Sequence, residues 1–142
     1  MTRLLDFIAR YLSFLYLSDA YRFTDSSHRG LADIDASVTL SGDTLRWDVT
    51  NDRGQFDLLV VPLRPEGNTR GYWLSLIRQY LEGGADTDQG TILSQLNWLQ
   101  DNLNRVEALF ADDAKTEKVC AELESLKRLN SYKNWGWPKP EA

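Results

Sequence analysis

The stretch IDASVTLSGDTLRWDVTNDRGQ, residues 34–55, decides the fold. Apolar and polar residues alternate over residues 34–40, and the alternation resumes over residues 45–49 after the turn residues at 41–43. Successive side chains of a β-strand point to opposite faces, so this alternation places the apolar residues on one face. The pattern therefore predicts a β-hairpin that is buried on one face only.

Runs on both sides of the hairpin extend it into a sheet. The turn residues 51–54 lead into a third run, in which residues 58–61 are all apolar. A continuous apolar run predicts a strand that is covered on both faces. Ahead of the hairpin, residues 21–24 predict a short strand and residues 25–30 predict a turn. The sequence thus predicts an antiparallel sheet of three or four strands.

The N-terminal residues 4–17 predict an amphipathic helix. Apolar residues recur there at helical spacing, while Asp6 and Arg10 fall toward the other side. These two charges interrupt any hydrophobic segment, and the run is shorter than the roughly 20 residues that span a bilayer. We therefore expect a helix that packs on the sheet, no signal peptide or membrane anchor, and a cytoplasmic location.

The second half of the chain is expected to be helical. The pattern predicts a helix over residues 71–81, a longer helix that opens at Thr91, and another after the break at 112–113. Proline and glycine in residues 134–140 exclude a regular helix in the tail. Together these elements predict a single α+β domain over residues 1–142, with an N-terminal helix, an antiparallel sheet and a C-terminal half of about three helices.

The overall composition limits the classes of partner. The chain has 16 basic and 21 acidic residues, a net charge of -5 and a pI of about 4.8. A protein that neutralises nucleic-acid phosphates or docks on an anionic membrane is normally basic, so we expect neither partner. The single cysteine, Cys120, excludes an intramolecular disulfide and a cysteine zinc site, and it is expected to be a small packed thiol.

The sequence contains no recognisable catalytic or metal-binding motif. The single histidine, His28, lies in a predicted loop among serines, where a solvated side chain is expected. Neither Asp33 with Asp35 nor Asp86 with Asp88 belongs to a known metal or phosphate motif. We therefore expect no enzyme activity, no cofactor and no metal, and a small enzyme that uses carboxylates alone is kept as an alternative.

Residues 81–114 form the most acidic part of the chain, with seven acids and one base. On the predicted long helix, Trp98, Asp101 and Arg105 are neighbours on the side away from the apolar stripe. Tryptophan and arginine are enriched among the residues that dominate binding energies, so this pattern indicates a protein contact. The alternative is that Trp98 packs under the tail or the first helix while Asp101 pairs with Arg105.

The tail residues Trp135 and Trp137 also have two interpretations. The tail folds back as a lid on the core, or it serves as a free docking motif.

Residues 40–55 resemble a pattern found in small bacterial proteins, many of them uncharacterised or linked to toxin neutralisation. In that pattern, two strands and a D-R-G-Q motif, here residues 52–55, open the third strand of a sheet. A leading helix and a helical run like residues 99–110 are also similar. The resemblance implies an α+β fold and a role as an immunity protein.

The leading expectation is a bacterial immunity protein, a cytoplasmic inhibitor that binds one cognate toxin domain, one to one, and blocks its active site. We expect contact through an acidic helical surface between Glu82 and Asp113, because a toxin that acts on an anionic substrate presents a basic cleft. The alternative is a structural or adaptor subunit of a bacterial assembly that binds permanently through an apolar face. The candidate toxin-binding residues are Asp86, Asp88, Trp98, Asp101, Arg105, Asp112 and Asp113.

Overall fold

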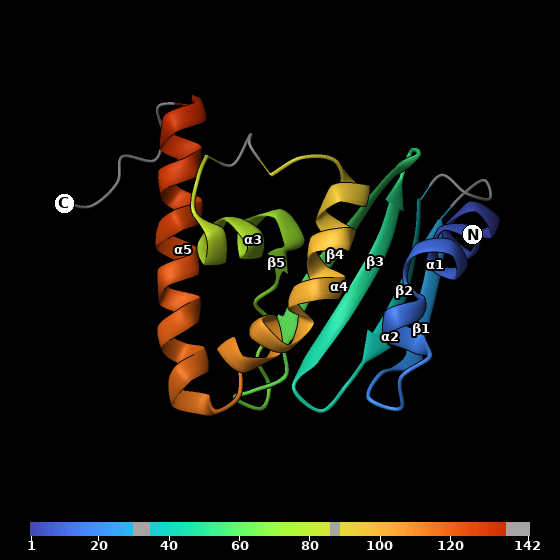
Figure 1. Ribbon diagram of the computed structural model, residues 1–142, viewed down its shortest axis with the longest axis horizontal. Coiled ribbons are helices and arrows are strands. Elements are labelled where there is room, and N and C mark those ends of the chain that lie inside the picture. The colour runs from blue at the N-terminus through green and yellow to red at the C-terminus, as the bar shows by residue number, and fades with distance from the viewer. Residues whose placement is uncertain (30–34, 86–88, 136–142) are drawn as a thin grey trace.

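The structure is a computed structural model that describes residues 1–29, 35–85 and 89–135 (Figure 1). The predicted α+β fold is confirmed, because N-terminal helices precede an antiparallel sheet and further helices follow it. The helices are α1 (Thr2–Tyr11), α2 (Ser13–Tyr16), α3 (Leu74–Glu82), α4 (Ile92–Leu109) and α5 (Asp113–Trp135). The strands are β1 (Arg22–Arg29), β2 (Asp35–Ser41), β3 (Leu45–Asp52), β4 (Gln55–Pro62) and β5 (Tyr72–Trp73).

The sheet is a five-stranded meander in the order β1-β2-β3-β4-β5, and every neighbouring pair is antiparallel. It has one strand more than the sequence predicts, because β5 has only two residues, too few to show a period-two pattern. Tyr72 and Trp73 of β5 pair with Val60 and Leu59 of β4 at one edge of the sheet. The strand β1 forms the other edge.

The central hairpin, β2 with β3, has the predicted alternation of burial. The cross-strand neighbours Leu40 and Trp47 are both fully buried, and so is Val49, which lies opposite the buried Val38. The intervening side chains lie on the other face and are partly exposed. The apolar residues of this hairpin therefore form the floor of the core.

The D-R-G-Q motif at residues 52–55 makes the turn between β3 and β4. Arg53 and Gly54 have φ angles of 54° and 89°, the left-handed backbone that a two-residue hairpin turn requires. The side chain of Asn51 accepts the backbone N–H of Gly54 at 2.8 Å. The motif therefore has a structural role in closing this hairpin.

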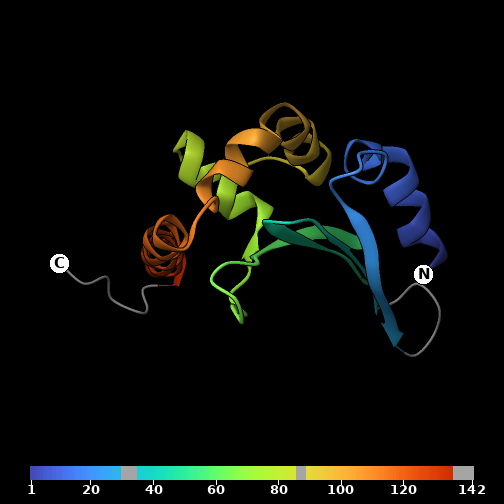
Figure 2. The ribbon, with the colours of Figure 1, turned by 90° about the horizontal axis from the view of Figure 1, so that it is seen from below.

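The helices gather on one face of the sheet, with α5 beyond its β5 edge (Figure 2). α1 contacts β2 and β3, while α3 packs on β4 and contacts both α4 and α5. Trp47, Tyr72 and Phe110 are the largest fully buried side chains between these layers, and Cys120 is buried there as expected. Within the described ranges, no helix is both long and apolar enough to cross a membrane.

The N-terminal helix predicted over residues 4–17 is divided in two. α1 ends at Tyr11 and α2 begins at Ser13, because Leu12 leaves the helical conformation with a φ of -116° and a ψ of 17°. Leu12 is nevertheless fully buried, so the change of direction keeps its side chain in the core.

The strand β1 is longer than the sequence predicts. It continues to Arg29, so residues 25–29, predicted as a turn, belong to a strand, and His28 lies in that strand rather than in a loop. Residues 22–27 are all exposed, so burial imposes no apolar alternation on them. Pairing with β2 determines this strand instead.

Two helix boundaries also differ from the prediction. α3 begins at Leu74 rather than at Gly71, because Tyr72 and Trp73 first pair with β4. α5 continues through Trp135, which the sequence assigns to a non-helical tail. The first proline of that tail is Pro138, three positions farther along the chain.

The apolar run at residues 58–61 of β4 is covered on both faces only in part. Leu58, Val60 and Val61 are buried, but Leu59 is only half-buried. Val61 points away from the helices, and the backbone of Gly71 lies against it and against Leu59 on that side. The prediction of a doubly covered strand therefore holds at the end of β4 next to Gly71.

Candidate functional site

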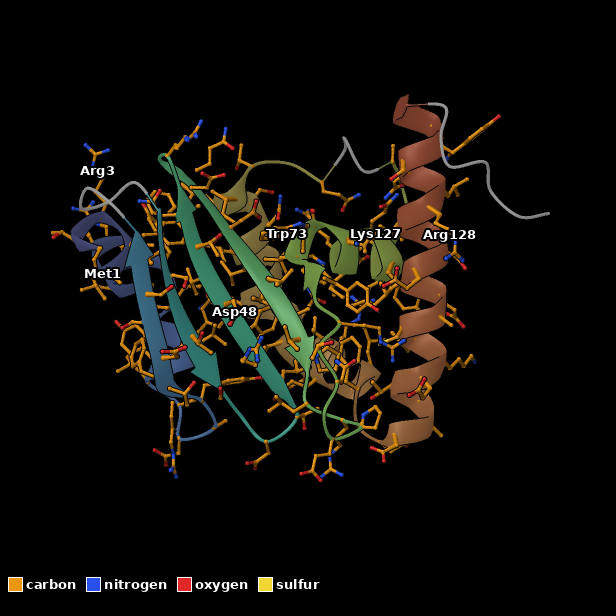
Figure 3. The ribbon with its side chains drawn as sticks, turned by 180° about the vertical axis from the view of Figure 1, so that it is seen from behind. Met1, Arg3, Asp48, Trp73, Lys127 and Arg128 are labelled. Carbon is orange, nitrogen blue, oxygen red and sulfur yellow. The ribbon has the colours of Figure 1, made fainter. Side chains whose placement is uncertain are left out.

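The second face of the sheet carries no helix of the described chain, and Figure 3 shows it toward the viewer with Asp48 near its middle. Its side chains come from alternate residues of β2, from β3 and β4, and from Thr24 and Asp25 at a register shift in β1, and they surround a hollow of about 470 Å³. We call this surface the open face. It consists of Thr24, Asp25, Ser37, Thr39, Arg46, Asp48, Thr50 and Leu59.

The carboxylate of Asp48 is the centre of the open face. Its Oδ1 accepts the hydroxyl of Thr39 from β2 at 2.9 Å, and its Oδ2 accepts Nη2 of Arg46 at 3.2 Å. Thr39 lies directly opposite Asp48 in the strand register, so the alternation of the hairpin itself produces this contact. The two bonds hold the carboxylate in one orientation.

Hydroxyl pairs tie the edge strand to the same surface. Thr24 Oγ1 and Ser41 Oγ are 2.8 Å apart, and the Oγ atoms of Ser27 and Ser37 are also 2.8 Å apart. Both pairs join β1 to β2. Side chains already held by cross-strand bonds lose little conformational entropy when a partner binds, so the open face is preorganised for contact.

The open face is acidic and retains unused hydrogen-bonding capacity. Near the hollow, Asp25, Asp48 and Asp57 carry three carboxylates, and Arg46 is the one cation that lines it among the described residues. The Nε atom of Arg46 is shielded from solvent and has no hydrogen-bond partner within the described part of the chain. Burial raises the pKa of Asp57, and a hydrogen bond from the backbone of Leu58 opposes that change.

The predicted contact residues Trp98 and Arg105 are brought together by Glu82, at the end of α3. Glu82 Oε1 accepts the indole N–H of Trp98 at 3.1 Å and Nη1 of Arg105 at 2.6 Å. Arg105 also donates to Asn102 Oδ1 at 2.8 Å. The hydrogen bond from Arg105, followed by that from Trp98, holds the pKa of Glu82 below its usual value. We call these four residues the Glu82 cluster.

The Glu82 cluster shows which partners Trp98 and Arg105 have within the chain. Arg105 pairs with Glu82, so its predicted alternative pairing with Asp101 is wrong. Trp98 is half-buried and packs against the core, with its indole N–H held by Glu82. Both side chains therefore join α3 to α4, as well as lying at the protein surface.

The acidic candidate residues have different surroundings. Asp101 is exposed on α4, and Asp113 is exposed at the start of α5. Asp112 accepts the backbone N–H of Lys115 at 2.7 Å and so caps the N-terminus of α5. Asp86 and Asp88 lie outside the described residues.

The open face was not predicted from the sequence. Its polar residues are visible as the alternate positions of residues 34–50, but such positions normally mark a solvated surface. The residue types at these positions were a usable signal of the open face. Thr39 and Asp48 fall opposite each other in the predicted hairpin, and their side chains can form a hydrogen bond across it.

No group of three or more histidine, cysteine or acidic residues in the described part of the chain is arranged to hold a metal ion. Comparison with known proteins identifies no match for this chain among family models, curated proteins or solved structures.

Proposed function

We propose that this protein is an immunity protein, a bacterial cytoplasmic inhibitor that binds one toxin domain and blocks its active site. The observation that carries the proposal is the open face, which is hollowed, acidic and held rigid by cross-strand bonds. A toxin that acts on an anionic substrate has a basic active-site cleft, and an acidic surface both attracts and fills such a cleft.

The resemblance to toxin-neutralising proteins implies the fold and the role but assigns no contact residue. The segment that carries it, residues 40–55, includes all of β3. That strand supplies Arg46, Asp48 and Thr50, which form the middle of the open face. We propose the open face as the main contact and the exposed acids Asp101 and Asp113 as secondary contacts.

The first experiment identifies the partner and measures inhibition. The tagged protein is used to retain partners from a lysate of its own cells, and a domain of the retained protein is then produced alone or together with this chain. We expect one partner, bound one to one, whose domain arrests growth only when this protein is absent. A retained partner that is not toxic contradicts the proposal.

A second experiment identifies the contact surface. Asp48→Asn removes the central charge of the open face without changing its shape, so we expect affinity for the toxin domain to fall about tenfold or more. Asp101→Asn is the comparison, because it removes one acid from a proposed secondary contact on the exposed side of α4 and should weaken binding less than Asp48→Asn does. If only Asp101→Asn weakens binding, the contact is the acidic helical surface predicted from the sequence.

One observation favours an adaptor subunit as the second candidate function. Large apolar side chains are exposed near the N-terminus, with Leu17 at 75%, Phe23 at 53% and Leu5 at 51%. Exposed apolar surface of this kind suits permanent association. An adaptor should be retained with a non-toxic assembly, and Leu17→Ser with Phe23→Ser should then release it while Asp48→Asn should not.

A further inference from the structure

A separate groove lies where the β5 edge of the sheet and the start of α3 face α5. It has a volume of about 180 Å³, its surface is mainly apolar, and Trp73, Leu76 and Lys127 are among its walls. Figure 3 shows Trp73 and Lys127 from the side of the open face, on neighbouring elements. We call this site the Trp73 groove.

The walls of the Trp73 groove are fixed by a reciprocal amide pair. The side-chain nitrogen of Gln79 donates to Asn130 Oδ1 at 3.0 Å, and the side-chain nitrogen of Asn130 donates to Gln79 Oε1 at 2.7 Å. Gln79 belongs to α3 and Asn130 to α5, so these bonds set the separation of the two helices. The groove is therefore preformed.

Trp73 is the exposed aromatic residue of the groove. Its side chain is 46% exposed, although tryptophan ordinarily buries most of its large apolar surface. Trp73 also lies opposite Leu59 of β4, at the margin of the open face. An indole that forms one wall of a preformed groove is the usual setting of a residue that dominates binding energy.

Lys127 supplies the charge of the groove. It makes no ion pair or hydrogen bond with any residue that the structure describes. The acids of the same helix are directed elsewhere, because Glu117 pairs with Arg70, Glu122 accepts the hydroxyl of Tyr80, and Glu124 lies beside the hydroxyl of Tyr72. The ammonium group is therefore available to a carboxylate.

We propose that the Trp73 groove binds one large apolar side chain of a partner protein, with a carboxylate next to that side chain paired with Lys127. The volume supports this occupant, since sites for small molecules are commonly about 300–1,000 Å³ and this groove is smaller. The cation supports an acidic neighbour, as charge complementarity fixes the orientation of a bound segment. This inference does not depend on the partner being a toxin.

The test uses two capped dipeptides that differ only in charge, acetyl-Phe-Asp-amide and acetyl-Phe-Asn-amide. Binding is followed by NMR at the indole N–H of Trp73, which Trp73→Phe assigns by its disappearance. We expect saturable shifts at this signal and an affinity about two- to fivefold higher for the aspartate peptide, the range of one exposed ion pair. The absence of saturable shifts overturns the proposal.

Two matched variants test the role of the charge. Lys127→Gln should abolish the preference for the aspartate peptide, while Arg128→Gln should leave it unchanged. Arg128 is the neighbouring cation of α5, and its guanidinium donates to Ser125 at 3.4 Å. Equal loss in both variants would mean that general charge, rather than the groove, causes the preference.

Other occupants give distinguishable results. If the peptides bind the Trp137→Ala variant but not the natural chain, the C-terminal segment of this chain occupies the Trp73 groove. The proposal of a partner protein is then wrong. A concentration-dependent dimer that Trp73→Ser abolishes would identify a second copy of the chain and overturn the proposal equally. A partner found under the proposed function plays no part in these measurements, so the two proposals can fail separately.

Discussion

The two faces of the central hairpin differ although their residues alternate along the same strands. On the covered face, Leu40, Trp47 and Val49 are fully buried beneath the helices. On the open face, Thr39 and Asp48 are part-buried and bonded to each other. Burial on the covered face therefore provides most of the stability. The side chains of the open face contribute less to stability and can contact a partner. A substitution on the covered face should therefore change mainly stability, and one on the open face mainly binding.

The largest expected effect is on the covered face. Trp47→Ala removes a fully buried side chain and leaves a cavity, so the free energy of unfolding should fall by about 3–5 kcal/mol. Urea denaturation followed by circular dichroism measures the change. Trp73→Ala is the matched control, because the exposed Trp73 should cost less than about 1.5 kcal/mol. Similar losses for the two variants would contradict the distinction between buried and exposed tryptophan.

A smaller loss of stability is expected at Gly71, where the end of β4 is covered on both faces. A side-chain Cβ added at Gly71 would lie 2.9 Å from Leu59 Cδ2 and 3.1 Å from Val61 Cγ2, on the side without helices. Gly71→Ala should therefore lower the free energy of unfolding by about 1–3 kcal/mol. Gly67→Ala provides a comparison with open space but a φ of +86°. If Leu59→Ala does not relieve the Gly71→Ala loss, contact with Leu59 is not its cause.

The bonds of the open face should contribute less to stability. Thr39→Val leaves Asp48 without one of its two donors, and the expected loss is about 0.5–1.5 kcal/mol. A double-mutant cycle with Asp48→Ala, which removes the acceptor, separates the Thr39–Asp48 bond from the effect of each residue alone. A coupling energy of zero in urea denaturation would show that the bond adds no stability.

The smallest expected effect is a pH dependence of the free energy of unfolding, which comes from Asp57 near the open face. Burial raises the pKa of Asp57, so the folded protein favours the protonated carboxyl more than the unfolded chain does. The resulting stability is present below the unfolded pKa and is lost as the pH rises through the folded pKa. Asp57→Asn should therefore stabilise the protein near neutral pH and lose this advantage in acid. Denaturation curves at several pH values measure it, and an advantage independent of pH would contradict the assignment to titration.

The sequence predicted the elements in which burial imposes a pattern. β2 and β3 follow from their alternation, and α4 follows from apolar residues at helical spacing, among which Leu96, Leu99 and Val106 are buried. β1 escaped prediction because its residues 22–27 are exposed, so its place in the sheet depends on pairing with β2. Local patterns report burial, and they carry little information about pairing alone.

The candidate surfaces were harder to predict than the fold. Glu82 is 16 residues from Trp98 and 23 from Arg105, and no local spacing joins residues so far apart. The Trp73 groove depends on a contact between Gln79 and Asn130, which are 51 residues apart. Such contacts arise only from the packing of α3 against its neighbours, which the sequence pattern of each helix does not specify.

The shortness of β5 limits how this protein can assemble through its backbone. β5 pairs with β4 through only two residues and passes directly into α3, so this side offers almost no strand for another chain. β1, at the opposite side, is eight residues long. If two molecules were to join their sheets there, both eight-residue edge strands would be used, and the two-residue β5 would leave a further copy little backbone to pair with.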